Sequence, residues 1–538
     1  METINQGLMP GETIRTGKPP LEFSKADKGM TAGMLACGFL FWEWIMANGG
    51  QPALGVTLFI AVLCAFSLLY YRQAGIRPSP AGFAALAAVC LSGAQFTLFA
   101  TMDLQFFNFL FLSSAFLYWT ALTSGTRLTG RLSGYILGDL FNQWLIVPFS
   151  NFAALPAGIR QSLKGTKKGR EIFGAAVGFL IFLPVLLLVI SLLSGADDAF
   201  SDFWNNLVRH LMLADLGTWL LEFILGIPVA CYLYGVLYGN ARKLHTGNLT
   251  HDGIAAGLRK LRVAPGAALY APLAAFNLLY LLFFIALGGY LFSAFFGDLP
   301  DTMTYAEYAR KGFFELCGVA AINLGVLALV YTLMKREKDA RPAPLRFLTG
   351  LMSAFTLLLV ATAMSKMLLY IASYGLTRLR VYTSWFMLLL FIAFLLIALW
   401  HVRRFDLSKP LILVFAIAFI ALTYANTDGI IAKYNIERHA AGELASLDYY
   451  ALAQLSDAAA PYLFEVFENA EDPEEKAQAR LALLCVGGYG YAYPVNPSVF
   501  DFAGSKDSDI IQQRPFGRHF NEWNRQTARA DALRAAVL

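Results

Sequence analysis

The chain has 538 residues, of which 57% are hydrophobic, 14% aromatic and only 15% charged, and its mean hydropathy is +0.54. Soluble domains of this size are more polar, so the composition excludes an ordinary soluble globular protein. The net charge of +5 conceals a division, because residues 427–538 hold 16 acidic against 10 basic residues and the rest of the chain is strongly basic.

Eleven apolar stretches are each about long enough to cross a bilayer, which takes roughly 20 helical residues for about 30 Å of hydrocarbon. We therefore expect an all-α integral membrane protein, a polytopic helix bundle of about eleven transmembrane helices with a small helical extracytoplasmic C-terminal tail. The expected spans are residues 30–47, 53–71, 80–100, 102–122, 172–194, 214–239, 265–296, 312–334, 347–371, 381–400 and 410–426.

Lysine and arginine alternate between the connectors of these spans. One set of connectors, which includes the N-terminus, carries 26 of them, and the opposite set carries only five. The positive-inside rule then predicts a cytoplasmic N-terminus (1–29), a membrane domain (30–426) and an extracytoplasmic soluble tail (427–538). The basic connectors also predict contact with anionic lipid headgroups, whereas nothing in the pattern favours nucleic acid as a partner.

One cytoplasmic connector contains an apolar stretch, Trp144 to Pro156, that is too short to cross the bilayer. It precedes a basic cluster that begins at Arg160. An interfacial or re-entrant segment fits this pattern, and a loop packed under the bundle fits it equally well.

Ionisable residues within the expected spans are few. Glu222, Glu315 and Lys366 lie inside spans, while Glu43 and Asp103 lie nearer span ends. Each such residue costs about 2.5 to 3.5 kcal/mol near a helix centre. Glu222, Glu315 and Lys366 are therefore candidates for a proton or ion relay, with a structural Glu–Lys pair as the alternative. Pro184, Pro228 and Pro272 also fall inside spans, where proline can open a helix or simply be tolerated.

A second candidate site is expected at the outer face. The positive-inside rule predicts few lysines and arginines in the outer connectors, yet four of the five that occur there lie close to the residues of this site. Arginines there could hold an acidic partner, an anionic substrate or a lipid phosphate. The residues of this candidate outer-face site are Tyr305, Glu307, Tyr308, Arg310, Tyr374, Arg380 and Tyr382.

No cofactor and no metal are expected, because the cysteines and histidines show no zinc-ligand spacing. The external run from Asp197 through Asp202 is acidic, but its spacing does not match a carboxylate metal motif, and caps of a short helix explain it better.

Five motifs occur in order along the chain: Asp197-Asp198-Ala-Phe, Phe276-Asn277-Leu278, the segments 305–314 and 374–382, and Asn426-Thr-Asp428 through Asn435. Together they resemble an uncharacterised family of bacterial multi-pass membrane proteins, domain of unknown function 4173. The resemblance implies a location in the bacterial cytoplasmic (inner) membrane, and it implies no activity or catalytic residue.

The tail is expected to hold short helices at 448–455 and 458–469, a helix starting with Asp472 before Pro473, and a final helix at 518–537. Three functional classes remain open. A transporter or channel comes first, then a sensor or envelope assembly scaffold that binds a protein partner through the tail. An enzyme acting on a lipid-linked substrate comes third, since no catalytic motif is recognisable.

Overall fold

The computed structural model describes residues 23–46, 53–163, 167–197, 200–204, 213–296, 313–335, 342–444, 446–487 and 520–537. Within those ranges the chain is helical and has no strand, apart from one isolated bridge between Ala264 and Met334. Nine helices of the described chain are long and apolar enough to cross a membrane, and one bent pair makes a tenth. The expected fold class, an all-α multi-pass membrane protein in a lipid bilayer, is confirmed.

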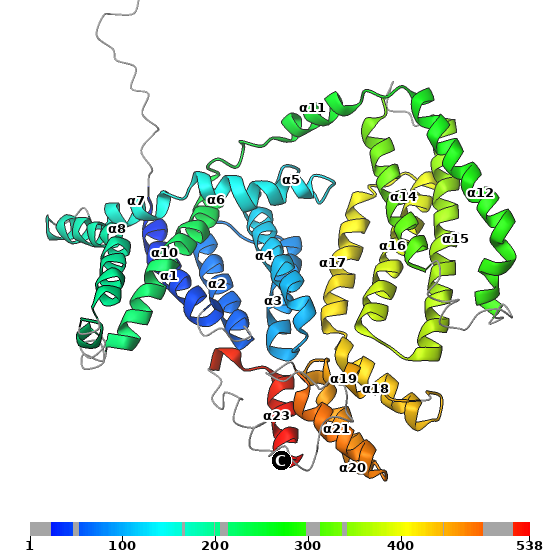
Figure 1. The fold of residues 1–538 in the computed structure, drawn as a ribbon. Helices are drawn as coiled ribbons and strands as arrows, with labels where there is room; N and C mark the ends of the chain where they lie inside the picture. Colours follow the sequence, from blue (N-terminus) through cyan, green and yellow to red (C-terminus); the bar gives the residue numbers. More distant parts are fainter. Residues whose placement is uncertain are drawn as a thin grey trace, which may run out of the picture.

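Two helical bundles stand side by side, with a smaller helical unit across one end of them (Figure 1). We call the end where α1 begins the upper end, as drawn, and the end covered by the C-terminal helices the lower end. The first, or N-terminal, bundle consists of α1 (Lys25–Phe41) with the π-helix η1 (Trp42–Met46), α2 (Leu54–Gln73), α3 (Pro80–Leu98), α4 (Met102–Ser124) and α10 (Leu213–Arg242).

Local sequence sets the start of these helices. The Ser24 hydroxyl accepts from the Asp27 amide at 3.2 Å and the Asp27 carboxylate accepts from the Ser24 amide at 2.7 Å, a reciprocal cap that begins α1. Ser79 caps α3 and is followed by Pro80 in the first helical position. Apolar side chains from α1, α2, α3, α4 and α10 then form one continuous core.

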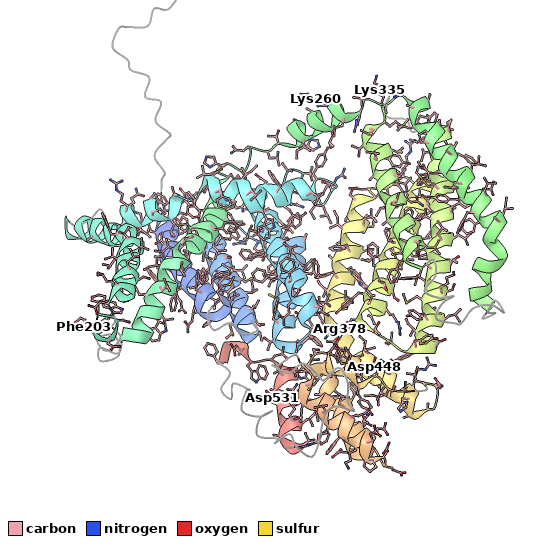
Figure 2. The ribbon with its side chains drawn as sticks, in the orientation of Figure 1. Phe203, Lys260, Lys335, Arg378, Asp448 and Asp531 are labelled. Carbon is pink, nitrogen blue, oxygen red and sulfur yellow. The ribbon has the colours of Figure 1, made fainter. Side chains whose placement is uncertain are left out.

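Short helices lie across the upper end of the first bundle. They are α5 (Ile136–Phe141), the π-helix η2 (Asn142–Ile146), α6 (Val147–Ser150) and α7 (Ala154–Leu163). The stretch from Trp144 to Pro156, expected to be interfacial, re-entrant or packed, thus lies on short helices that do not cross the bundle (Figure 1). The long helix α8 (Lys167–Ala196) follows and runs from the upper end toward Phe203 at the lower end (Figure 2).

The second bundle consists of α12 (Gly266–Phe296), α14 (Phe313–Leu333), α15 (Ala343–Tyr374) and α16 (Arg378–Val402). Their apolar faces form a separate core. Helices α10 and α12 continue through Pro228 and Pro272, so neither proline breaks its helix. A single short helix, α11 (His251–Leu261), connects the two bundles at the upper end (Figure 1).

Helix α17 (Ser408–Tyr424) lies between the bundles and contacts α16 on one side and α3 on the other. It is followed by α18 (Thr427–Ala440) after a bend of 58°. Asn426 makes that bend in the left-handed conformation, with φ 51°, which asparagine tolerates better than most residues. The bend turns the chain from the spanning direction onto the lower end.

The C-terminal tail packs around its own apolar core. Its helices are α18, α19 (Tyr449–Ala453), η3 (Asp457–Ala459), α20 (Ala460–Asn469), α21 (Pro473–Cys485), η5 (Phe520–Glu522) and α23 (Arg525–Val537). Asp472 caps α21 ahead of Pro473, and this predicted helix start is confirmed. The predicted helices at 448–455 and 458–469 are also found, and the described part of the final one is α23.

Nine of the eleven expected spans coincide with single helices that meet the criteria for crossing, and 410–426 falls on the bent pair α17 and α18. The stretch 172–194 lies on α8, where many side chains fall outside the described residues, so its crossing stays a prediction. The domain limits and the side of the membrane that each end faces also stay predictions.

Candidate functional site

Two acidic side chains of the first bundle meet near its lower end. Glu43 comes from the π-helix that ends α1, and Glu222 comes from α10. Their carboxyl groups lie within interaction distance of each other. Glu222 is only 6% exposed, and its Oε2 atom has no hydrogen-bond partner among the described residues. A hydrogen bond between two carboxyl groups needs a proton on one of them, because ionised carboxylates only accept. The pair could therefore hold one shared proton.

Close backbone contact between α1 and α10 brings the two acids together. A Cβ atom at Gly226 would lie 2.5 Å from the carbonyl carbon of Gly38, so only glycine permits this crossing. Glu222 is about one turn from Gly226 on α10 and Glu43 is just over one turn from Gly38 on α1. The π-helical turn Trp42–Met46 re-aims the end of α1, as such insertions often do at functional sites.

The same two helices hold a second buried acid at the upper end. Asp27 of α1 is 1% exposed and forms an ion pair with Arg242, at the end of α10. Tyr70 of α2 donates to its Oδ1 at 2.7 Å. The described part of the bundle between these acid sites is filled mainly by apolar side chains such as Met34 and Leu63. The first bundle thus has a buried acid near each end and an apolar layer between them.

A second charged cluster joins the three parts of the molecule. Arg378, the first residue of α16, donates from Nε and Nη2 to the two carboxylate oxygens of Asp428 in α18, each at 2.8 Å. It also lies 3.2 Å from the carboxylate of Asp103, at the start of α4. Asp428 is fully buried and accepts a further bond from the Ser456 amide at 2.9 Å. Arg378 therefore links the first bundle, the second bundle and the tail (Figure 2).

The tail makes a second contact with the first bundle. Asn524 donates to the carbonyl of Phe96 at 2.8 Å, and the Gln526 side chain accepts from the Ala100 amide at 2.9 Å. Gln526 also donates to Asn426 at the bend after α17, at 2.6 Å. These bonds satisfy backbone groups at the end of α3 that have no partner within the helix. They hold the tail against the lower end of α3.

The three residues proposed for an intramembrane relay do not form one group. Glu222 lies in the first bundle, whereas Glu315 and Lys366 lie in α14 and α15 of the second. Glu315 is exposed on the first turn of α14, while Lys366 is 1% exposed. The described partner of Glu222 is Glu43, which the sequence places nearer a span end. Two acids far apart in the sequence carry no local signal of their contact.

The candidate outer-face site is described only in part, since Tyr305, Glu307, Tyr308 and Arg310 lie outside the described residues. Arg380 donates to the Tyr374 carbonyl at 2.8 Å and its guanidinium lies 4.0 Å from the ring centroid of Tyr370, so it caps α15. The Tyr382 hydroxyl is buried without a hydrogen-bond partner among the described residues. The cation that joins distant elements here is Arg378, two residues away from the proposed Arg380.

Within the described residues, no group of three or more His, Cys, Asp or Glu side chains is placed to hold a metal ion. Asp197 is at the end of α8, and Asp198 lies outside those residues. The predicted cap of this acidic loop stays a prediction.

The fold and these clusters define an all-helical, multi-pass membrane protein. Residues 81–466 match the family model described as Domain of unknown function (DUF4153), and the chain belongs to that family. The resemblance to domain of unknown function 4173 is therefore wrong.

The matched region contains Arg378, Asp103 and Asp428, but it begins after Glu43. No curated protein matches the chain. No solved structure matches it either.

Proposed function

We propose that this protein is a membrane transporter that uses protons, with Glu43 and Glu222 as its proton-binding site. The observation that carries the proposal is the contact between their carboxyl groups, one of which is nearly buried on a spanning helix. An ionisable group inside the membrane is costly and is a functional site by default. A pair of carboxyl groups can bind or release a proton when the helices that carry them move, because two adjacent carboxylates repel.

The arrangement of α1 and α10 supports this proposal. The crossing at Gly38 and Gly226 places backbone against backbone, which lets two helices shift without repacking bulky side chains. Acid groups near both ends with an apolar layer between them suit a path that opens to one side at a time. The predicted membrane for this activity is the bacterial inner membrane, with the lower end outside.

Proton flux into liposomes tests the proposal without knowledge of the substrate. The purified chain would be reconstituted with pyranine inside, and a potassium gradient with valinomycin would supply the potential. We expect acidification above that of protein-free liposomes, and Glu222→Gln and Glu43→Gln should slow it by about tenfold or more. Glu437→Gln, a change at an exposed residue of α18, is the matched control. Flux equal to that of empty liposomes, or full flux in both glutamine variants, would overturn the proposal.

The second candidate is a sensor or assembly scaffold that acts through the tail, and the Arg378 cluster favours it. A partner bound to the tail could act on both bundles through Asp428, because Arg378 contacts all three parts. Gln526→Ala should loosen the tail while leaving Glu43 and Glu222 in place. Loss of cellular function in this variant, with the proton flux unchanged, would favour the scaffold over the transporter.

A further inference from the structure

We propose that α11 and the continuous helical segment α5–η2–α6 together form an in-plane binding surface for anionic lipid headgroups at the upper end. The proposal is independent of the transport function, since it concerns how the protein contacts its membrane. The segment α5–η2–α6 lies across the upper end of the first bundle, and α11 runs from there to the upper end of the second, where a headgroup layer would lie (Figure 1).

Helix α11 has the composition of a helix that lies in a membrane surface. Its 11 residues are too few to span, and none of them is buried. Leu258 is 36% exposed, Leu261 49% and the following Val263 63%. Arg259 and Lys260 are exposed beside them. Apolar side chains that enter the acyl boundary next to cations that reach headgroup phosphates are typical of interfacial helices.

The segment α5–η2–α6 presents a row of apolar side chains on one side only. Leu137 is 76% exposed, Phe141 53%, Leu145 46% and Phe149 58%. They follow one another at intervals of four residues, so they share one face of the helix. The opposite face packs on the first bundle and is buried, as Asn142 and Gln143 show at 1% exposed each. The exposed row therefore has no cover within the described chain.

Side-chain and backbone contacts connect the two elements and both bundles into one surface. The His251 ring at the start of α11 packs edge-on against Tyr135 at the start of α5, with 4.7 Å between ring centroids. Beyond α11, the Ala264 amide donates to Leu333 at 3.0 Å and the Ala264 carbonyl accepts from Lys335 at 3.0 Å. These bonds fasten the end of the segment to α14. Figure 2 shows Lys260 and Lys335 at this upper end.

Charge decides between a lipid and a protein as the occupant. Arg259, Lys260 and Arg262 lie on or just after α11. Lys335 lies just after α14, where the segment that follows α11 is bonded to it. Cations in this position are attracted to an anionic leaflet. A row of exposed apolar side chains near the ends of spanning helices also suits the acyl boundary beneath the headgroups. A bilayer meets both features at once.

Amide hydrogen exchange of the full chain in nanodiscs tests the surface. One nanodisc contains phosphatidylcholine alone and the other an equal mixture with phosphatidylglycerol. We expect the amides of 251–261 to exchange at least about fivefold more slowly in the mixture, the factor that one cation at an anionic surface supplies. High salt should remove the difference, since exposed charges are screened.

The triple variant Arg259→Gln, Lys260→Gln, Arg262→Gln should abolish the lipid dependence while its melting temperature stays that of the wild type. The matched control is Arg403→Gln with Arg404→Gln, two exposed arginines at the upper end after α16, and it should keep the dependence. Equal exchange in both lipids would overturn the proposal. Slow exchange that persists in detergent would also overturn it, because α11 would then be covered by protein. Proton flux is not measured here, so failure of either proposal leaves the other standing.

Discussion

Arg378 and Asp428 are joined by two parallel hydrogen bonds of 2.8 Å, one to each carboxylate oxygen. The carboxylate is fully buried, while 26% of the arginine side chain is exposed. This fork-to-fork geometry is the strong form of an ion pair and fixes direction as well as distance. It places the start of α16 against the start of α18, and Asp103 adds the start of α4 to the same point.

Arg378→Gln should therefore loosen the tail. The change leaves the buried charge of Asp428 without its main partner, and breaking a buried pair in this way costs about 3 to 5 kcal/mol. We expect faster cleavage of the tail by protease and a lower melting temperature. Lys433→Gln is the control, because its pair with Glu437 is exposed and contributes about 0.3 to 0.5 kcal/mol. Equal effects of the two changes would contradict the assigned role of Arg378.

Arg534→Met should unfold the tail core more than the membrane bundles. Arg534 and Asp457 form an ion pair at 1% and 2% exposed, and Arg534 also donates to backbone carbonyls of Leu483 and Val486. The single change leaves Asp457 charged and buried, which costs about 3 to 5 kcal/mol. Adding Asp457→Asn should recover part of the loss. Chemical unfolding of the four proteins as a double-mutant cycle measures this, and strict additivity would count against the pair.

Gly226→Ala should separate α1 from α10. Its new Cβ would meet Gly38 at 2.5 Å, and such overpacking costs about 1 to 3 kcal/mol. The change should also slow the proton flux, because it moves Glu222 away from Glu43. Gly217→Ala on the same helix is the matched control, since a Cβ there meets nothing within 4 Å. Both variants would be compared by thermal melting and by pyranine fluorescence.

The burial of Asp139 in α5 predicts that the stability of the protein depends on pH. Burial raises the pKa of this carboxyl above its usual value of 3.8, although its bond from the Leu128 amide at 2.7 Å opposes the shift. The unfolded chain then ionises Asp139 at a lower pH than the folded protein does. As the pH rises from about 4, wild-type stability should fall relative to Asp139→Asn, which keeps an acceptor oxygen. Melting temperatures in nanodiscs at several pH values measure the difference, and a constant difference would refute the expectation.

Apolar length alone predicted most of the spanning helices, because each must satisfy its backbone within one continuous stretch of sequence. Helix starts such as Asp472 before Pro473 were predictable for the same local reason. Contacts between distant stretches were not. The sequence groups Glu222 with Glu315 and Lys366, which lie in the other bundle. It also does not distinguish Arg378 from Arg380, because spacing does not show which of two nearby arginines points across the lower end.

The row from Leu137 to Phe149 shows another limit. The apolar stretch that begins at Trp144 covers only part of it, because a short helix with one exposed apolar face is neither long enough nor uniformly apolar enough to stand out in the sequence. The structure shows that only one face of this segment is exposed, because its other face, with Asn142 and Gln143, packs against the first bundle. The match over residues 81–466 places this whole segment within the family's shared region.

The three-way contact at Arg378 has a mechanical consequence. Arg378 ties both bundles and the tail at the lower end, and Asn524 and Gln526 tie the tail to α3 at the same end, whereas the segment 243–265 joins the bundles at the upper end and α17 packs between them. A rotation of one bundle against the other would therefore pivot near the lower end. Displacements would then be small at the lower end and greatest at the upper end, where α11 would move along the lipid surface as the bundles tilt apart.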